Sequence, residues 1–141
     1  MNFLKTAVVL AILTTASPLV AGEVTIDLTG IQAGSGDLYI GLQTKDQFLK
    51  DAGSYGTIIR APKAGNQAVQ IKDVAEGEYH IGIWHDTNGD GKFSADDRGI
   101  PIDGWSSYKS ETLRAAPTWD AVKFSVPSGA TCVKLAMVYP K

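Results

Sequence analysis

The residues of this chain that are best suited to chemistry gather in one twelve-residue segment, residues 86–97. Oxygen-bearing side chains stand at its positions one, three, five, nine and twelve, and a glycine stands at position six, where the chain must turn sharply. This is the D-x-[DN]-x-[DN]-G pattern of calcium loops, since Ca²⁺ prefers six to eight oxygen ligands. We expect one structural calcium ion, held by side chains and by the lysine's backbone carbonyl. The expected ligands are Asp86, Asn88, Asp90, Lys92, Ser94 and Asp97.

This acidic loop (residues 86–97) contains four aspartates and one lysine, a net charge of −3. Converging carboxylates repel one another, which favours a bound cation. Asp97 stands where a bidentate Glu is usual, so we expect weak affinity. The alternative is an ion-free turn, because Asn-Gly and Asp-Gly are favoured hairpin dipeptides. A strand pattern before the loop, and Gly99, Pro101 and Gly104 after it, exclude the flanking helices of a calcium sensor.

Other patterns for catalysis or metal binding are weak. His80 and His85 fall on opposite faces of one expected strand, so they cannot share a metal ion, and packing is the favoured role of His85. Residues 106–109 fit the nucleophile pattern S-x-x-K, but its partner motifs are absent from the sequence. Cys132 is the only cysteine, which excludes an intrachain disulfide, and we expect it to be buried among apolar neighbours. These residues favour a noncatalytic protein.

A second set of candidate residues is aromatic. Residues 87–118 show little periodicity, and a stretch of that length in a compact domain is usually functional. The expected ligand-binding residues are Trp105, Tyr108 and Trp119. Rings that are exposed can stack on sugars, and Trp105 and Tyr108 are the better candidates because a strand begins beside Trp119. The alternative is that the rings cap the core.

The start of the chain has the pattern of an export signal. Lys5 precedes an uncharged apolar run over residues 6–16, and small residues follow around Ala21. This pattern predicts a cleaved signal peptide over residues 1–21 and a periplasmic or secreted domain over residues 22–141. The run is too short to span a membrane, and no later segment is long enough.

The remaining sequence must position these candidate residues, and it is typical of strands. Tyr79, Ile81 and Ile83 alternate with less apolar residues, which is the period of a half-buried strand. The expected strands cover residues 24–28, 38–42, 57–60, 68–74, 77–85, 122–126 and 131–139, with one helical turn over 45–51. Short strands separated by turn signals predict an all-β protein. We expect a single antiparallel β-sandwich, immunoglobulin-like or prealbumin-like, with a long irregular loop region.

Length and charge set limits on the function. The chain has 141 residues, which allows one domain beyond the signal. Its 13 Lys and Arg residues nearly balance 15 Asp and Glu residues. A basic face for phosphate is therefore not expected, which excludes nucleic acid as a main partner.

Several segments resemble one family of exported bacterial proteins, domain of unknown function 2141. The segments that carry the resemblance are residues 36–40, 85–92, 99–101, 103–105 and 116–119. The chain departs from the family pattern at Ser106, Ser107, Tyr108 and Lys109, where Gly, Phe, Ser and Asn are expected. The resemblance implies an exported domain of the β-sandwich type and no established activity.

Together these patterns predict an exported, noncatalytic β-sandwich module with a structural calcium loop. We expect it to bind an unidentified ligand or envelope partner through residues 87–118. The alternative is a carbohydrate-binding module that uses Trp105 and Tyr108, and an enzyme of unknown reaction is the least favoured hypothesis.

Overall fold

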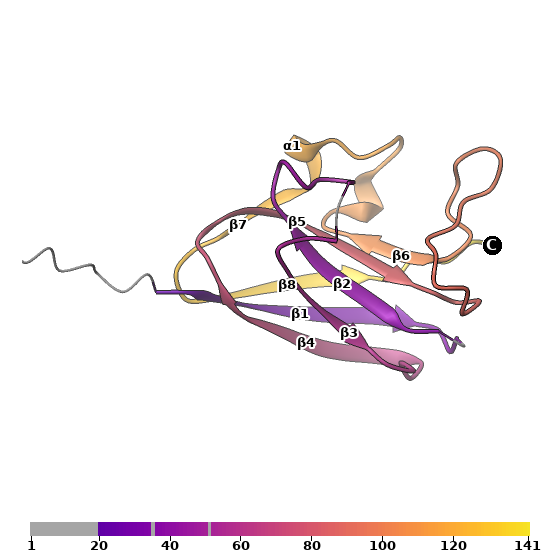
Figure 1. Cartoon of the computed structure of the whole chain (residues 1–141), viewed down its shortest axis with the longest axis horizontal. Helices are drawn as coiled ribbons and strands as arrows, with labels where there is room; N and C mark the ends of the chain where they lie inside the picture. Colours follow the sequence, from indigo (N-terminus) through magenta and orange to yellow (C-terminus); the bar gives the residue numbers. More distant parts are fainter. Residues whose placement is uncertain (1–19, 35, 51) are drawn as a thin grey trace, which may run out of the picture.

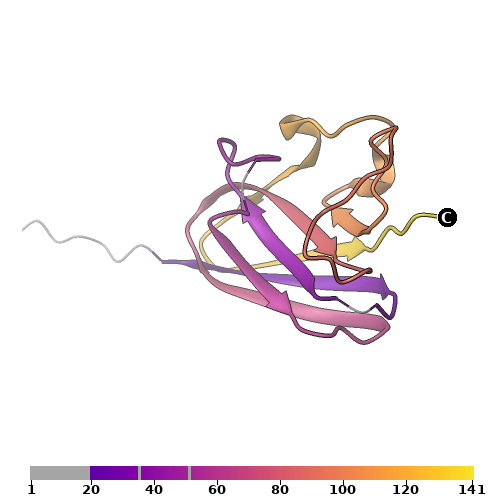
Figure 2. The same ribbon diagram turned by 45° about the vertical axis from the view of Figure 1, so that its right-hand side comes forward.

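The computed structural model describes residues 20–34, 36–50 and 52–141. The predicted signal peptide lies almost entirely outside these residues. Within them the chain forms two layers of strands, which Figures 1 and 2 show from two directions. The strands of the first sheet lie in the order β4-β1-β8, namely Gly65–Val74, Gly22–Ile31 and Ala130–Ala136.

The second sheet has the order β3-β2-β5-β6. Its strands are β3 (Tyr55–Ile59), β2 (Leu38–Gln43), β5 (Gly77–His85) and β6 (Gly104–Ser107). A further strand, β7 (Lys123–Val126), pairs with the beginning of β5. The long strand β5 therefore pairs with β2 along one edge and with the two short strands β6 and β7 along its other edge.

The core lies between the two sheets. Alternate residues of β1 (Val24, Ile26 and Leu28) are almost fully buried, and alternate residues of β2 and β5 meet them from the other sheet. Burial with a period of two is what a strand with one apolar face requires. The expected all-β sandwich is confirmed.

One strand pair is parallel. β8 runs alongside β1 in the same direction, from Glu23 opposite Ala130 to Thr29 opposite Ala136, whereas the other paired strands are antiparallel. The chain reaches β8 from β7, which belongs to the opposite sheet. Because the chain crosses from one layer to the other here, β8 joins the first sheet and runs parallel to β1.

Three expectations need correction. The irregular stretch contains β6 and a short 3-10 turn, Ser110–Thr112, and a four-residue helix, α1 (Trp119–Val122), precedes β7. Residues 45–50 form successive hydrogen-bonded turns rather than a helix, and residue 51 lies outside the described residues. Cys132 is exposed, because the alternation of β8 directs Val133 and Leu135 into the core instead.

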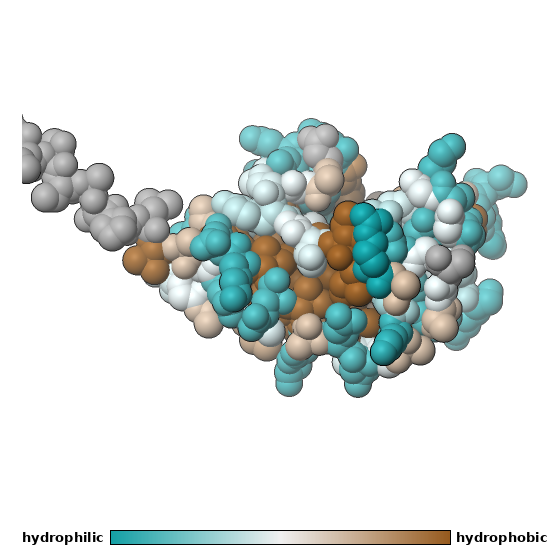
Figure 3. All heavy atoms as spheres, turned by 60° about the horizontal axis from the view of Figure 1, so that its bottom comes forward, coloured by the Kyte–Doolittle hydropathy of each residue, from teal (hydrophilic) through white to brown (hydrophobic). Residues whose placement is uncertain are grey.

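The surface has a concentrated apolar region on the side where β3 and β4 lie in Figure 1. Figure 3 shows this side, with hydrophobic residues in its middle and hydrophilic side chains around them. Among the described residues, no helix is both long and apolar enough to cross a membrane.

Candidate ligand-binding groove

Three rows of residues cross the outer face of the second sheet. Residues directly opposite one another in an antiparallel pair project to the same face, so the register defines the rows. The apolar row consists of Ile58 and three aromatic residues, Tyr39, Trp84 and Trp105. The glycine row consists of Gly56, Gly41 and Gly82. The polar row consists of Gln43 and His80.

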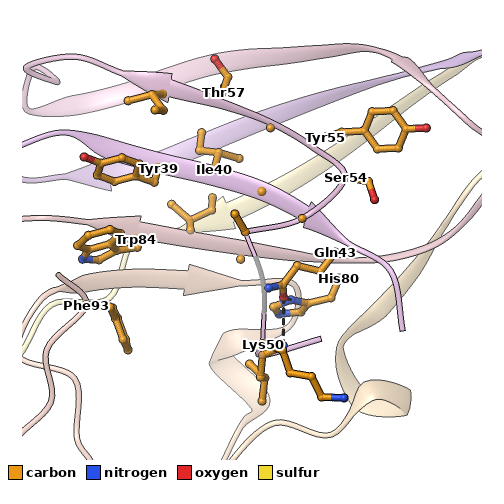
Figure 4. A pocket seen from close by; sticks show the side chains of 18 residues that line it. Tyr39, Ile40, Gln43, Lys50, Ser54, Tyr55, Thr57, His80, Trp84 and Phe93 are labelled. Carbon is orange, nitrogen blue, oxygen red and sulfur yellow. Dashed lines mark hydrogen bonds between the residues drawn. The ribbon is translucent and has the colours of Figure 1, made fainter. Parts of the chain in front are cut away.

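The glycine row forms the floor of a groove of about 740 Å³ (Figure 4). The described residues between β2 and β3, 44–50 and 52–54, cover one side of this floor. A Cβ atom on Gly41 would lie 2.2 Å from the carbonyl oxygen of Ala52, so only glycine allows this approach. At Gly82 the floor is open. A Cβ atom added there would find its nearest neighbour, Cε1 of His80, at 3.5 Å, which is an ordinary van der Waals distance.

Aromatic rings form one end of the groove. The rings of Tyr39 and Trp84 stack with centroids 4.6 Å apart, and Phe93 meets Trp84 edge-on at 6.3 Å. Phe93 belongs to the acidic loop, which stands at one end of the sandwich in Figure 1. The acidic loop therefore supplies part of the groove wall.

Asp103 positions the Trp84 ring at this end of the groove. Its carboxylate is fully buried and accepts hydrogen bonds from the indole nitrogen of Trp84 at 3.1 Å, the hydroxyl of Thr87 at 3.1 Å and the amide nitrogen of Ser94 at 3.2 Å. Trp84 lines the groove, whereas Thr87 and Ser94 belong to the acidic loop. One carboxylate thus holds the groove and the acidic loop together, a role that no motif or spacing in the sequence predicts for Asp103.

The opposite end of the groove is polar. The Oε1 atom of Gln43 accepts a hydrogen bond from the backbone nitrogen of Leu49 and lies 2.9 Å from Nδ1 of His80. An amide oxygen only accepts, so Nδ1 carries the proton, and Nε2 accepts from the hydroxyl of Ser107 at 2.9 Å. Burial lowers the pKa of His80 to about 4, so the ring is neutral at pH 7. With both nitrogens occupied, His80 positions this end of the groove.

The acidic loop brings three of the six expected calcium ligands together. Asp86 is buried, and its carboxylate accepts backbone hydrogen bonds from Gly89, Asp90 and Gly91 at 2.9–3.1 Å. The side-chain nitrogen of Asn88 donates to Asp90 at 3.2 Å. These bonds close the loop around the Asp86 side chain.

The other three expected ligands lie along the second half of the loop. The hydroxyl of Ser94 donates to the carbonyl of Lys92 at 3.5 Å, while Asp97 is exposed. Its neighbour Asp96 bonds to Arg98 and to the backbone of Ile100. Within the described residues, no group of three His, Cys, Asp or Glu side chains is arranged to hold a metal ion. Calcium binding therefore stays a prediction from the sequence.

The three expected aromatic ligand residues do not line the groove. Trp105 is half-buried and exchanges two backbone hydrogen bonds with Val138. Tyr108 packs against Phe124 with ring centroids 5.6 Å apart, and the ammonium of Lys109 lies 5.3 Å from its ring. The ring of Trp119 meets Phe48 edge-on at 5.7 Å. Each ring is partly covered by its own neighbours.

The two histidines occupy opposite faces of β5, as expected. His85 is fully buried on the inner face, where its Nδ1 lies 2.8 Å from the hydroxyl of Tyr139. His80 lies on the outer face beneath Phe48, whose ring is 5.0 Å away. Neither arrangement brings the imidazoles together.

The architecture defines an all-β sandwich with a groove on the outer face of one sheet. The chain belongs to the bacterial family described as "Uncharacterized protein conserved in bacteria (DUF2141)", whose model matches residues 26–134. This range includes the groove and the acidic loop. No curated protein and no solved structure matches the chain significantly.

Proposed function

We propose that this protein is an exported, noncatalytic binding module whose groove holds the apolar part of a small amphipathic molecule. The observation that carries the proposal is the exposure of three large apolar side chains that all line the groove. Leu49 is 59% exposed, Phe93 54% and Ile58 44%. Clustered apolar exposure of this kind marks a binding surface. The groove volume also falls within the usual range of small-ligand sites, roughly 300–1,000 Å³.

The ring geometry favours an amphipathic ligand over a sugar. Stacking on a sugar needs an open aromatic face, but Tyr39 and Trp84 cover one face of each other. Phe93 further crowds Trp84. The carbohydrate alternative has Trp105 and Tyr108 as platforms, and neither ring is among the described residues that line the groove.

Export and calcium complete the proposal. The signal pattern over residues 1–21 supports a periplasmic or secreted location. A calcium ion in the acidic loop would act structurally, since the loop carries Phe93 to the groove wall. Cell fractionation tests the location: the intact chain should reach the periplasm or medium, and a chain without residues 1–21 should stay in the cytoplasm.

Fluorescence titration with N-phenylnaphthylamine, a neutral apolar probe, tests the groove. We expect saturable binding to one site per chain. Gly82→Val fills the open part of the floor without a clash of its Cβ atom, so probe affinity should fall at least about tenfold while the protein stays folded.

Ser125→Val is the matched control, because it adds the same side chain at an exposed position of β7 outside the groove. It should leave probe binding unchanged. Absence of saturable binding, or equal affinity in wild type and Gly82→Val, would contradict the proposal. Retention of the protein on envelope polysaccharides, lost on Trp105→Ala, would favour the carbohydrate alternative.

A further inference from the structure

Among the described residues that line the groove, Lys50 has the single charged side chain, and none of these residues is an aspartate or a glutamate. In the described part of the chain, the ammonium of Lys50 forms neither an ion pair nor a hydrogen bond. A cation beside an apolar surface, with no acidic side chain among the described residues that line the groove, attracts an anion. The protein as a whole carries a formal charge of −2, so this attraction is local to the groove.

Lys50 lies at one end of the groove. Figure 4 places it near Gln43 and His80, away from Trp84 and Phe93. Trp84 and His80 are four positions apart on β5, which corresponds to about 13 Å along an extended strand. The groove therefore has an apolar end and a cationic end, with the open floor at Gly82 between them.

We infer that the ligand is a single-chain anionic amphiphile, such as a medium-chain fatty carboxylate. Its chain lies over Gly82 toward Trp84 and Phe93, and its anionic head faces Lys50. His80 is neutral and both its ring nitrogens are occupied, so Lys50 is the group that recognises the head. This inference rests on the proposed function and specifies the class of ligand.

Competition experiments test the head group separately from the groove. Decanoate, decanol and decyltrimethylammonium share one chain and differ in charge, and each is used to displace N-phenylnaphthylamine from the wild-type protein. We expect decanoate to displace the probe at roughly fivefold lower concentration than decanol, a difference typical of a partly exposed ion pair. The trimethylammonium compound should be the weakest competitor.

Lys50→Met keeps an unbranched apolar stem and removes the charge. It should abolish the advantage of decanoate and leave decanol unchanged. Lys45→Met is the matched control, because Lys45 is an exposed lysine of the same segment that does not line the groove. This control should retain the wild-type order of competitors.

Equal displacement by decanoate and decanol, or an unchanged preference in Lys50→Met, would overturn the inference while leaving the proposed function intact. A second arm uses vesicles of anionic phospholipid. Binding to vesicles without displacement by monomeric decanoate would also overturn it, because the recognised anion would then be a membrane surface. Failure of the neutral probe itself to bind would contradict the proposed function instead.

Discussion

The indole nitrogen of Trp84 donates a hydrogen bond to the carboxylate of Asp103 across 3.1 Å, and this carboxylate joins the groove to the acidic loop. Asp103 is fully buried and has no ion pair in the described part of the chain. A buried carboxylate without a cation is costly unless several donors satisfy it. Two further donors, from Thr87 and Ser94, meet that requirement.

Asp103→Ala should therefore lower the free energy of unfolding by about 3 kcal/mol, since three donors lose their acceptor in a buried site. Asp103→Asn should cost less, because its one amide oxygen still accepts. Urea unfolding followed by tryptophan fluorescence gives these values. Asp97→Ala, at an exposed position of the acidic loop, should change stability by about 0.5 kcal/mol or less. Equal effects of Asp103→Ala and Asp97→Ala would contradict this role of Asp103.

Stability should fall in mild acid because of His80. Its pKa in the folded protein is lowered by burial from 6.5 to about 4, so the unfolded chain binds the proton first as the pH decreases. This contribution is fully present above pH 6.5, is lost progressively toward pH 4, and amounts to a few kcal/mol at most. Burial also lowers the pKa of His85, which acts in the same direction.

Proton NMR of the imidazoles measures this directly. The His80 signal should remain that of a neutral ring until the pH approaches 4. Urea unfolding across the same range should show a weaker pH dependence in His80→Gln than in wild type. Titration of the His80 ring near its ordinary value would show that the ring is not shielded from water.

Two glycines of one row should respond differently to the same substitution. In Gly41→Ala the new methyl group would meet the carbonyl oxygen of Ala52, so the segment must move at a cost of about 1–3 kcal/mol. Gly82→Ala meets only ordinary contacts and should be neutral or stabilising by up to about 1 kcal/mol. Thermal unfolding of both variants checks this, and equal effects would show that Ala52 does not lie against Gly41.

Calcium should stabilise the protein if the acidic loop binds it. We expect a dissociation constant of roughly 10⁻⁴–10⁻³ M, and at 100-fold that concentration a gain of about 2.7 kcal/mol, since only the folded loop gathers the ligands. Thermal unfolding in chelator and in millimolar calcium measures the gain.

Asp90→Ala should abolish this gain in stability. Asp96→Ala removes the same charge from the loop without removing an expected ligand, and should keep it. Equal midpoints of wild type with and without calcium would favour the ion-free turn.

The strands were predictable because alternation is a local property of the sequence. In β1, for example, Val24, Ile26 and Leu28 show the same alternation in sequence and in burial. The four residues of β6 are too few to show a period, and the strand forms because β5 offers an open edge beside Trp84. In place of the helical turn expected over residues 45–51, the described residues form successive turns, because their backbone hydrogen bonds join residue i+3 to residue i.

The groove was not predictable in the same way. Gly41, Gly56 and Gly82 are ordinary strand glycines in the sequence, and only the register between strands places them in one row. Asp103 is a comparable case, since its burial depends on donors from β5 and from the acidic loop. Such sites depend on pairing between distant segments, which periodicity does not report.

The parallel pairing of β1 with β8 has a consequence for how the chain matures. The second long neighbour of β1 consists of residues 130–136, which follow β1 in the sequence only after all the other strands, so the three-stranded sheet cannot close before these residues have been synthesised. Contacts between opposite ends of a sequence also form slowly, because the intervening chain must first be brought into place. The three-stranded sheet therefore closes late in folding, after the strands between β1 and β8 in the sequence have been made.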